Sequence, residues 1–86
     1  MSLEAFEKYD YSRSKNRGSS HTNMLLIQRL GINHIPDQDV LRVYQEDDTH
    51  EFLLKNDVYA RYSKGMQQNS RSAFRHYAEY LQEKAA

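Results

Sequence analysis

The sequence predicts a small α+β domain, in which a β-hairpin or three-stranded meander over residues 40–63 lies between two helices. Two short segments of the middle region pair apolar side chains across a loop, which is typical of antiparallel strands. Near the carboxyl end, apolar side chains recur at the i, i+3, i+4, i+7 spacing of a helix. An earlier apolar run ends at Gly31, and glycine commonly terminates helices. We therefore expect helices at 23–30 and 70–84, with the sheet between them.

Length and composition restrict the class of protein. The chain has 86 residues, enough for one small domain, and its 12 basic and 12 acidic residues give a formal net charge of zero. It contains no cysteine, which excludes a disulfide framework, a Cys-ligated zinc and a thiol nucleophile. It has neither an apolar run of transmembrane length nor the pattern of a secretory signal. We expect a cytoplasmic protein without membrane contact.

Residues 1–22 are predicted to form a flexible, basic N-terminal arm. Within it, Leu3 and Phe6 allow one amphipathic helical turn. The segment 9–23 then has no aliphatic side chain, but three basic residues, four serines and one glycine. It also lacks hydrophobic periodicity, as disordered segments do. A single globular domain is therefore expected over 23–86.

The first predicted helix, 23–30, has a start signal and a stop signal. Asn23 is a good N-cap, and five apolar residues follow it before the chain reaches Gly31. Gly31 suits the left-handed residue that follows many helices.

The predicted hairpin pairs strand 40–45 with strand 50–55 across an acidic loop. In this register, two apolar pairs face each other on one side of the sheet. The pairs are Leu41 with Leu54, and Val43 with Phe52. Residues 57–64 form either a third strand or a two-turn helix capped by Asn56 or Asp57.

An all-helical alternative stays open for the same region. Pro36 suits the first position of a helix, where Asp37 and Asp39 would lie in the first turn. If 36–46 and 49–64 are both helical, the fold is an all-α bundle of four short helices.

The last predicted helix, 70–84, has the clearest pattern. Asn69 or Ser70 caps it, and its apolar side chains form one stripe. The stripe consists of Phe74, Tyr77, Ala78 and Leu81. We expect this stripe to pack on the apolar face of the sheet.

The zero net charge conceals three blocks. Residues 8–36 carry five bases and one acid, residues 37–57 carry seven acids and two bases, and residues 58–86 carry five bases and two acids. Basic ends suit a polyanion, but they also suit pairing of one copy's ends with another copy's acidic middle.

Two groups of basic residues are candidates for contacts with nucleic acid, because arginine and lysine neutralise phosphates and tyrosine rings stack on unpaired bases. The first group lies in the arm beside Tyr9 and Tyr11, and the second accompanies Tyr59 and His76. The candidates are Arg13, Lys15, Arg17, Arg61, Lys64, Arg71 and Arg75. The alternative for the second group is that Tyr59 and Tyr62 pack in the core while the charges face solvent.

No residue pattern indicates catalysis, a cofactor or a metal site. An acidic cluster with one histidine falls within a single predicted loop, and no second cluster supports metal binding. Its residues are Asp47, Asp48, His50 and Glu51. Ser70 and His76 lack an accompanying aspartate and an oxyanion-hole glycine. We therefore expect no enzymatic activity.

Two segments carry resemblances to DNA-recombination proteins. The predicted order of strands, glycine and capped helix resembles the arm-binding domains of phage-type integrases. Residues 72–81 (SAFRHYAEYL) resemble helices of recombinase core-binding domains. Each resemblance covers less than a third of the chain, and the glycine turn of the first family's hairpin is absent, so no residue role is transferred.

Two functions follow from these observations. The first is a small non-enzymatic accessory or regulatory protein that binds DNA or RNA through the basic arm and the basic face of the last helix. The alternative is a protein-interaction module, expected to be a homodimer, whose tyrosine- and phenylalanine-bearing faces form the interface.

Overall fold

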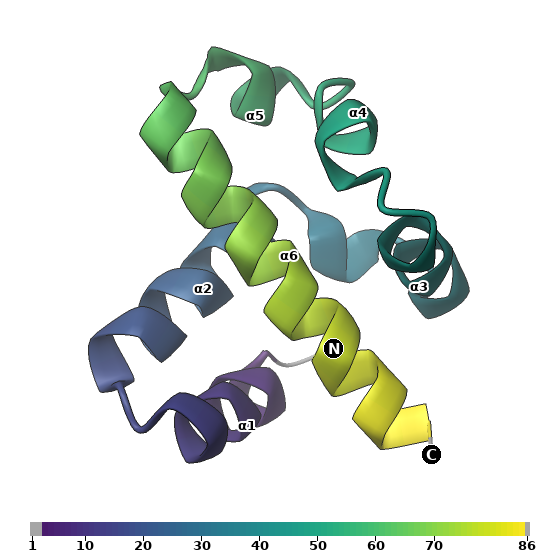
Figure 1. Ribbon diagram of the computed structural model, residues 1–86. Coiled ribbons are helices and arrows are strands. Elements are labelled where there is room, and N and C mark those ends of the chain that lie inside the picture. Colours follow the sequence, from purple (N-terminus) through teal and green to yellow (C-terminus); the bar gives the residue numbers. More distant parts are fainter. Residues whose placement is uncertain (1–2, 86) are drawn as a thin grey trace.

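Helices are the only regular secondary structure in the described part of the chain. A computed structural model describes residues 3–85, and these contain no strand (Figure 1). The elements are α1 (Glu4–Ser14), α2 (Arg17–Arg29), the 3₁₀ turn η1 (Ile32–His34), α3 (Asp37–Gln45), α4 (Thr49–Leu53), α5 (Asp57–Arg61) and α6 (Lys64–Ala85). The α+β prediction, with its hairpin or meander at 40–63, is therefore wrong.

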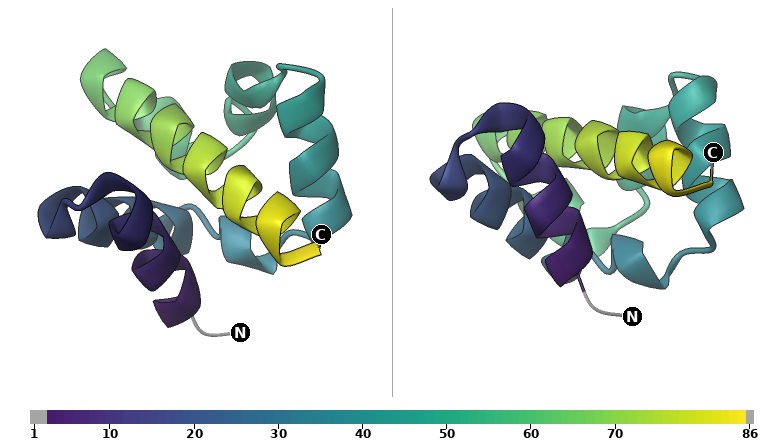
Figure 2. Two further views of the ribbon diagram at one scale, coloured as in Figure 1. Left: turned by 60° about the horizontal axis from the view of Figure 1, so that its bottom comes forward. Right: turned by 90° about the horizontal axis from the view of Figure 1, so that it is seen from below.

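The long helix α6 is the centre of the fold. It packs against each of the other five α-helices, with α1 and α2 on one side and α3 and α4 on the other (Figures 1 and 2). The radius of gyration is 12.0 Å, close to the value of about 12 Å for a compact chain of this length. The short helices thus form one layer around α6 and cover its buried face.

The predicted apolar stripe of the last helix is confirmed. Phe74 and Ala78 are fully buried, and Tyr77 and Leu81 are nearly so. The helix begins six residues earlier than predicted, at Lys64, so Asn69 and Ser70 are interior residues and not caps. The Ser70 hydroxyl instead donates to the Met66 carbonyl at 2.8 Å, which satisfies it inside the helix.

The predicted flexible arm instead forms α1 and the first turns of α2, which are joined by Lys15 and Asn16; Met1 and Ser2 lie outside the described residues. Phe6 is fully buried, with its ring centroid 5.2 Å from that of Tyr77 and 5.7 Å from that of Tyr80. Asn16 caps α2, because its side chain accepts a hydrogen bond from the Ser19 amide at 3.0 Å. Phe6 and Asn16 therefore help to hold a segment that has no hydrophobic periodicity.

The helix predicted at 23–30 corresponds to the second half of α2, which starts at Arg17 and ends at Arg29, with Leu30 as its C-cap. Asn23 is a buried interior residue and not the cap. The stop signal is confirmed, since Gly31 has φ 69° directly after the helix.

Helices replace both strands of the predicted hairpin. Val40 and Val43 are buried on one face of α3, and their three-residue spacing fits a helix, since strand alternation would place them on opposite faces. Leu54, expected to pair with Leu41, is 41% exposed. The reason lies in tertiary packing. Helix α3 packs its apolar face on α6, and a two-stranded ribbon by itself would bury less apolar surface.

The segment expected at 49–64 as one helix is two short helices. Asn56 separates them: its Oδ1 accepts from the amides of Val58 and Tyr59 at 2.9 and 3.2 Å, and its Nδ2 donates to the Leu30 carbonyl at 2.9 Å. The helical interpretation with Asn56 as cap is thus confirmed for Asp57–Arg61, but the helix is shorter than the predicted 57–64, and Lys64 belongs to α6. Asn56 also fixes α5 to the end of α2.

Tyr77 gives the first testable prediction. Its ring is 1% exposed and its hydroxyl has no hydrogen-bond partner among the described residues, and burial, followed by the charge of Asp37, raises its pKa to about 12. Tyr77→Phe should leave stability at neutral pH unchanged or slightly higher, because it removes an unsatisfied hydroxyl. Above a pH of about 10, the wild type should lose stability relative to the variant, since tyrosine ionises more readily in the unfolded chain.

Urea denaturation of both proteins at neutral pH and at about pH 11 measures this difference. A Tyr77→Phe variant that is less stable by more than about 1 kcal/mol at neutral pH would contradict the prediction.

Candidate functional site

A buried polar network joins α1, α2 and α6. Asp10 of α1 is 3% exposed, and its Oδ1 lies 2.8 Å from Nδ1 of His76 on α6. Its Oδ2 accepts a hydrogen bond from Nδ2 of Asn23 on α2 at 2.8 Å. Burying a carboxylate is costly unless both oxygens are paired. Here Asn23 of α2 and His76 of α6 supply the partners of the two carboxylate oxygens.

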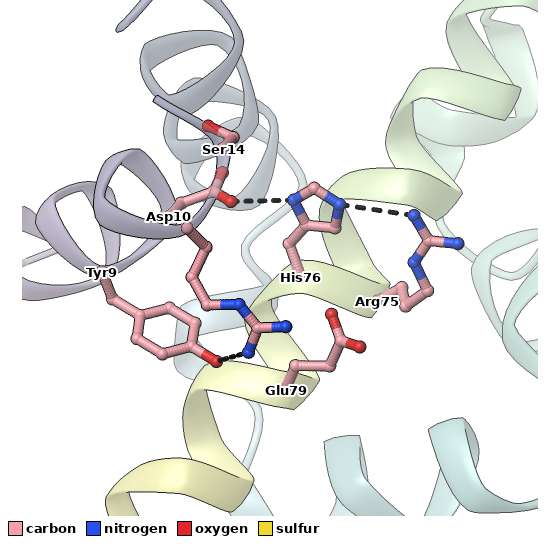
Figure 3. Close-up of a pocket in the computed structure, with 7 residues that line it drawn as sticks. Tyr9, Asp10, Ser14, Arg75, His76 and Glu79 are labelled. Carbon is pink, nitrogen blue, oxygen red and sulfur yellow. Dashed lines mark hydrogen bonds and ion pairs between the residues drawn. The ribbon is translucent and has the colours of Figure 1, made fainter. Parts of the chain in front are cut away.

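The network determines which way the His76 ring faces. Nδ1 carries the proton that is donated to Asp10, since a carboxylate can only accept. Nε2 then has a free lone pair, and Nη2 of Arg75 lies 3.3 Å from it, within reach to donate. Asp10 thus holds the ring so that Nε2 points outward, toward Arg75 (Figure 3).

A recess of about 370 Å³ opens beside this ring, between α1 and α6. Its lining combines two arginines and one histidine with two carboxylates and two hydroxyl groups. The residues are Tyr9, Asp10, Arg13, Ser14, Arg75, His76 and Glu79. A second recess, of about 420 Å³, shares Ser14 and His76 and is otherwise lined by small polar residues of α2 and α6.

The Asp10–His76 pair does not form a nucleophilic triad. Ser14 lies on the Asp10 side of the recess, while Nε2 of His76 points away toward Arg75 (Figure 3). Oγ of Ser14 is instead 3.4 Å from Oγ of Ser20. A serine nucleophile would need to contact the outer nitrogen of the histidine.

Arg13, which belongs to the segment predicted as a flexible arm, lines this recess from α1. Its Nη1 donates to the Tyr9 hydroxyl at 2.7 Å, and its guanidinium lies 5.6 Å from the Tyr9 ring centroid. The hydrogen bond to Tyr9 raises the pKa of Arg13, and the charges of Tyr9, Glu79 and Glu83 act in the same direction. The side chain therefore stays positively charged, and it lines the same recess as Arg75.

Basic residues continue along α6. Arg75 also lines a recess of about 620 Å³ between α6 and the α3–α4 corner, together with Arg71 and His50. Arg71 and Lys64 line a further recess of about 560 Å³ toward the start of α6. We call the residues Arg13, Arg75, Arg71 and Lys64 the basic track.

Arg71 has a structural role within the track. Its Nη1 donates to the Tyr59 hydroxyl at 2.8 Å, and Nδ1 of His50 lies 2.7 Å from the same hydroxyl. Tyr59 is fully buried, so its ring packs in the core and is not available to stack on a base.

The remaining predicted candidates lie off the track. Lys15 is the exposed, left-handed residue that ends α1, and Arg61 is exposed at the end of α5. Arg17 begins α2, and its guanidinium lies 5.5 Å from the ring centroid of Tyr11, in a recess on another side of α1. Of the seven predicted residues, the fold brings Arg13, Lys64, Arg71 and Arg75 into adjoining recesses.

Sequence reasoning missed Asp10 and Asn23 as partners of His76. One signal was present: Asp10 is the one acidic residue within the basic block 8–36. An isolated acid among bases has a reason to be paired, but nothing in the sequence tells that its partner is His76.

Residues 3–85 contain neither a metal site nor a membrane-spanning helix. No group of three or more acidic, histidine or cysteine side chains is arranged to hold a metal ion. Nor does any helix of this part of the chain have the length and apolarity needed to cross a bilayer.

Comparison with protein-family models, with curated proteins and with solved structures found no match to this chain. The three-stranded sheet behind the resemblance to integrase arm-binding domains is not part of this fold.

Proposed function

We propose that the protein is an accessory or regulatory protein that binds nucleic acid through the phosphate backbone, along the basic track, and that it acts by binding and not by catalysis. The observation that carries the proposal is the convergence of Arg13 and Arg75 on one recess, although they come from opposite ends of the chain. Arg71 and Lys64 extend this cationic surface along α6.

The dimensions of the track suit a phosphate backbone. Lys64 and Arg75 are eleven residues apart on one helix, a distance of about 16 Å at 1.5 Å per residue. Phosphates of one duplex strand advance about 3.4 Å per base along the axis, so the track reaches several of them. The recesses on either side of α6 give the backbone room to lie close to the helix.

The charge balance predicts moderate affinity with a clear dependence on salt. Three acids, Asp10, Asp47 and Glu79, line the same recesses, which limits non-specific attraction. Four phosphate contacts imply a slope of log K against log salt of roughly −2.8 for a single strand to −3.6 for a duplex. Binding should therefore weaken roughly 50- to 150-fold between about 50 and 200 mM salt.

The test is fluorescence anisotropy of labelled single-stranded and duplex oligonucleotides over a range of salt concentrations. The double variant Arg13→Gln, Arg75→Gln should bind roughly tenfold or more weakly and should flatten the salt slope by about one to two units. The matched control is Lys15→Gln, Arg61→Gln, which removes the same charge from two exposed residues off the track.

The two double variants separate the track from general electrostatics. Equal losses in both would contradict the track as the binding surface, because net charge alone would then explain binding. No binding of the wild type at tens of micromolar protein and about 50 mM salt would overturn the proposal.

The alternative of a homodimer with an aromatic interface has less support. Most of the aromatic side chains expected to form that interface pack inside the core of a single chain. Phe6, Tyr59, Phe74 and Tyr77 are all buried. In residues 3–85, the large apolar side chains that stay exposed are Tyr11, Leu54 and Val58. A stable interface normally has a larger apolar centre than these three provide.

A further inference from the structure

We propose that the recess between α1 and α6 binds a phosphate group of the nucleic acid when His76 is protonated, so that binding there takes up a proton. This inference rests on the proposed function and adds a specific subsite and a pH dependence to it. The ligand is a phosphate held between His76, Arg75 and Arg13.

The His76 ring is held in one orientation by its buried partner. Asp10 accepts from Nδ1 in the buried network, which leaves Nε2 directed at the recess. In the neutral ring, Nε2 is an acceptor, and the guanidinium of Arg75 can donate to it across 3.3 Å. The closed contact between these two groups therefore belongs to the neutral state of His76.

Protonation of the ring changes that contact. A protonated imidazole donates from both nitrogens, so Nε2 and the Arg75 guanidinium become two cationic donors that face each other. They can no longer bond directly. A phosphate oxygen between them accepts from both, with charge-assisted hydrogen bonds. Protonation thus converts an internal contact into a site for an anion.

The local charge count depends on the same proton. The charged groups that face His76 are Arg13 and Asp10 from α1, and Arg75 and Glu79 from α6. Two positive and two negative charges balance while the histidine is neutral. From α2, the neighbours are the uncharged Asn23, Ser19 and Thr22, and Tyr9 of α1 adds a phenol. One proton therefore gives the recess its net positive charge.

Histidine is the side chain whose charge commonly changes between about pH 8 and pH 5. A second histidine, His50, also lines the track, where it lies against Tyr59 and Arg71. It is the competing source of a pH-dependent affinity, so the experiment must separate the two.

The experiment measures the affinity for a 12-residue oligothymidylate by anisotropy between about pH 5.5 and pH 8 at constant ionic strength. The wild type should bind at least about fivefold more tightly at the acidic end. His76→Gln, which can still donate to Asp10 through its amide, should bind with little change over this range. The control His50→Gln should keep the pH dependence of the wild type.

Isothermal titration calorimetry provides a second measurement that does not depend on His76→Gln. Titrations in buffers of different ionisation enthalpy, at about pH 7, should show net uptake of protons on binding by the wild type and by His50→Gln. If His76→Gln does not fold, the titration of His50→Gln decides the question, because proton uptake that is lost with His50 would contradict the inference. Oligothymidylates with and without a 5′-phosphate distinguish a terminal phosphate from a backbone phosphodiester as the group in the recess.

The outcomes separate this inference from the proposed function. Binding that is independent of pH, absence of proton uptake, or a pH dependence that is lost in His50→Gln and kept in His76→Gln would overturn the inference and leave nucleic-acid binding intact. No binding at any pH would overturn both.

Discussion

Replacing Phe6 by alanine should lower the free energy of unfolding by about 3–5 kcal/mol. The side chain is fully buried and lies edge-on to Tyr77, and it also contacts Tyr80. Its removal leaves a cavity where α1 meets α6, and the aromatic pairing is lost as well. For a domain of this size, the melting temperature should fall by about 12 °C or more.

Urea denaturation followed by circular dichroism measures this effect, and Tyr11→Ala is the matched control. Tyr11 lies on the same helix but is 38% exposed, so its removal should cost no more than about 1 kcal/mol. If Phe6→Ala cost no more than Tyr11→Ala, α1 would not be part of the core, and Arg13 would not be held beside Arg75.

Asp10→Ala should destabilise the protein by about 3 kcal/mol. The substitution leaves two donors without their acceptor: Nδ2 of the buried Asn23 and Nδ1 of His76. Because the three residues belong to three different helices, the loss loosens the contacts of both α1 and α2 with α6. The measurement is again the free energy of unfolding in urea, at neutral pH.

Asp10→Asn is the control for this prediction. It keeps the size of the side chain and one acceptor oxygen for His76, so it should cost clearly less than Asp10→Ala. A double-mutant cycle with Asn23→Ala should show coupling between the two positions, because the second substitution removes a donor that the first has already orphaned. Additive losses would mean that Asp10 and Asn23 act independently.

The same network connects stability with the proposed binding site. Asp10 fixes the ring of His76, and the ring directs Nε2 toward the recess in which Arg13 and Arg75 meet. Asp10→Asn therefore has a second expected consequence, because it replaces the charged partner of His76 by a neutral one. The pH dependence of binding should therefore differ from that of the wild type.

The sequence by itself determined the elements whose signals are local. The stripe through Phe74 and Leu81 predicted the buried face of α6, because helical spacing places these side chains on one side whatever surrounds them. Gly31 predicted the end of α2, because the left-handed conformation there costs glycine little. The sequence also marked Arg13, Lys64, Arg71 and Arg75 as candidates, without placing Arg13 beside α6.

Only the tertiary structure decided between strand and helix for 40–55, and between an arm and a helix for 4–14. Leu41 and Val43 would share a face of a strand, whereas Val40 and Val43 share a face of a helix, and α6 provided the apolar surface that favours the helix. The sequence did not predict the network of Asp10, Asn23 and His76 either, because the hydrogen-bond partners of the buried carboxylate are distant in the chain. Such contacts form only when packing brings three helices together, and no local pattern specifies that meeting.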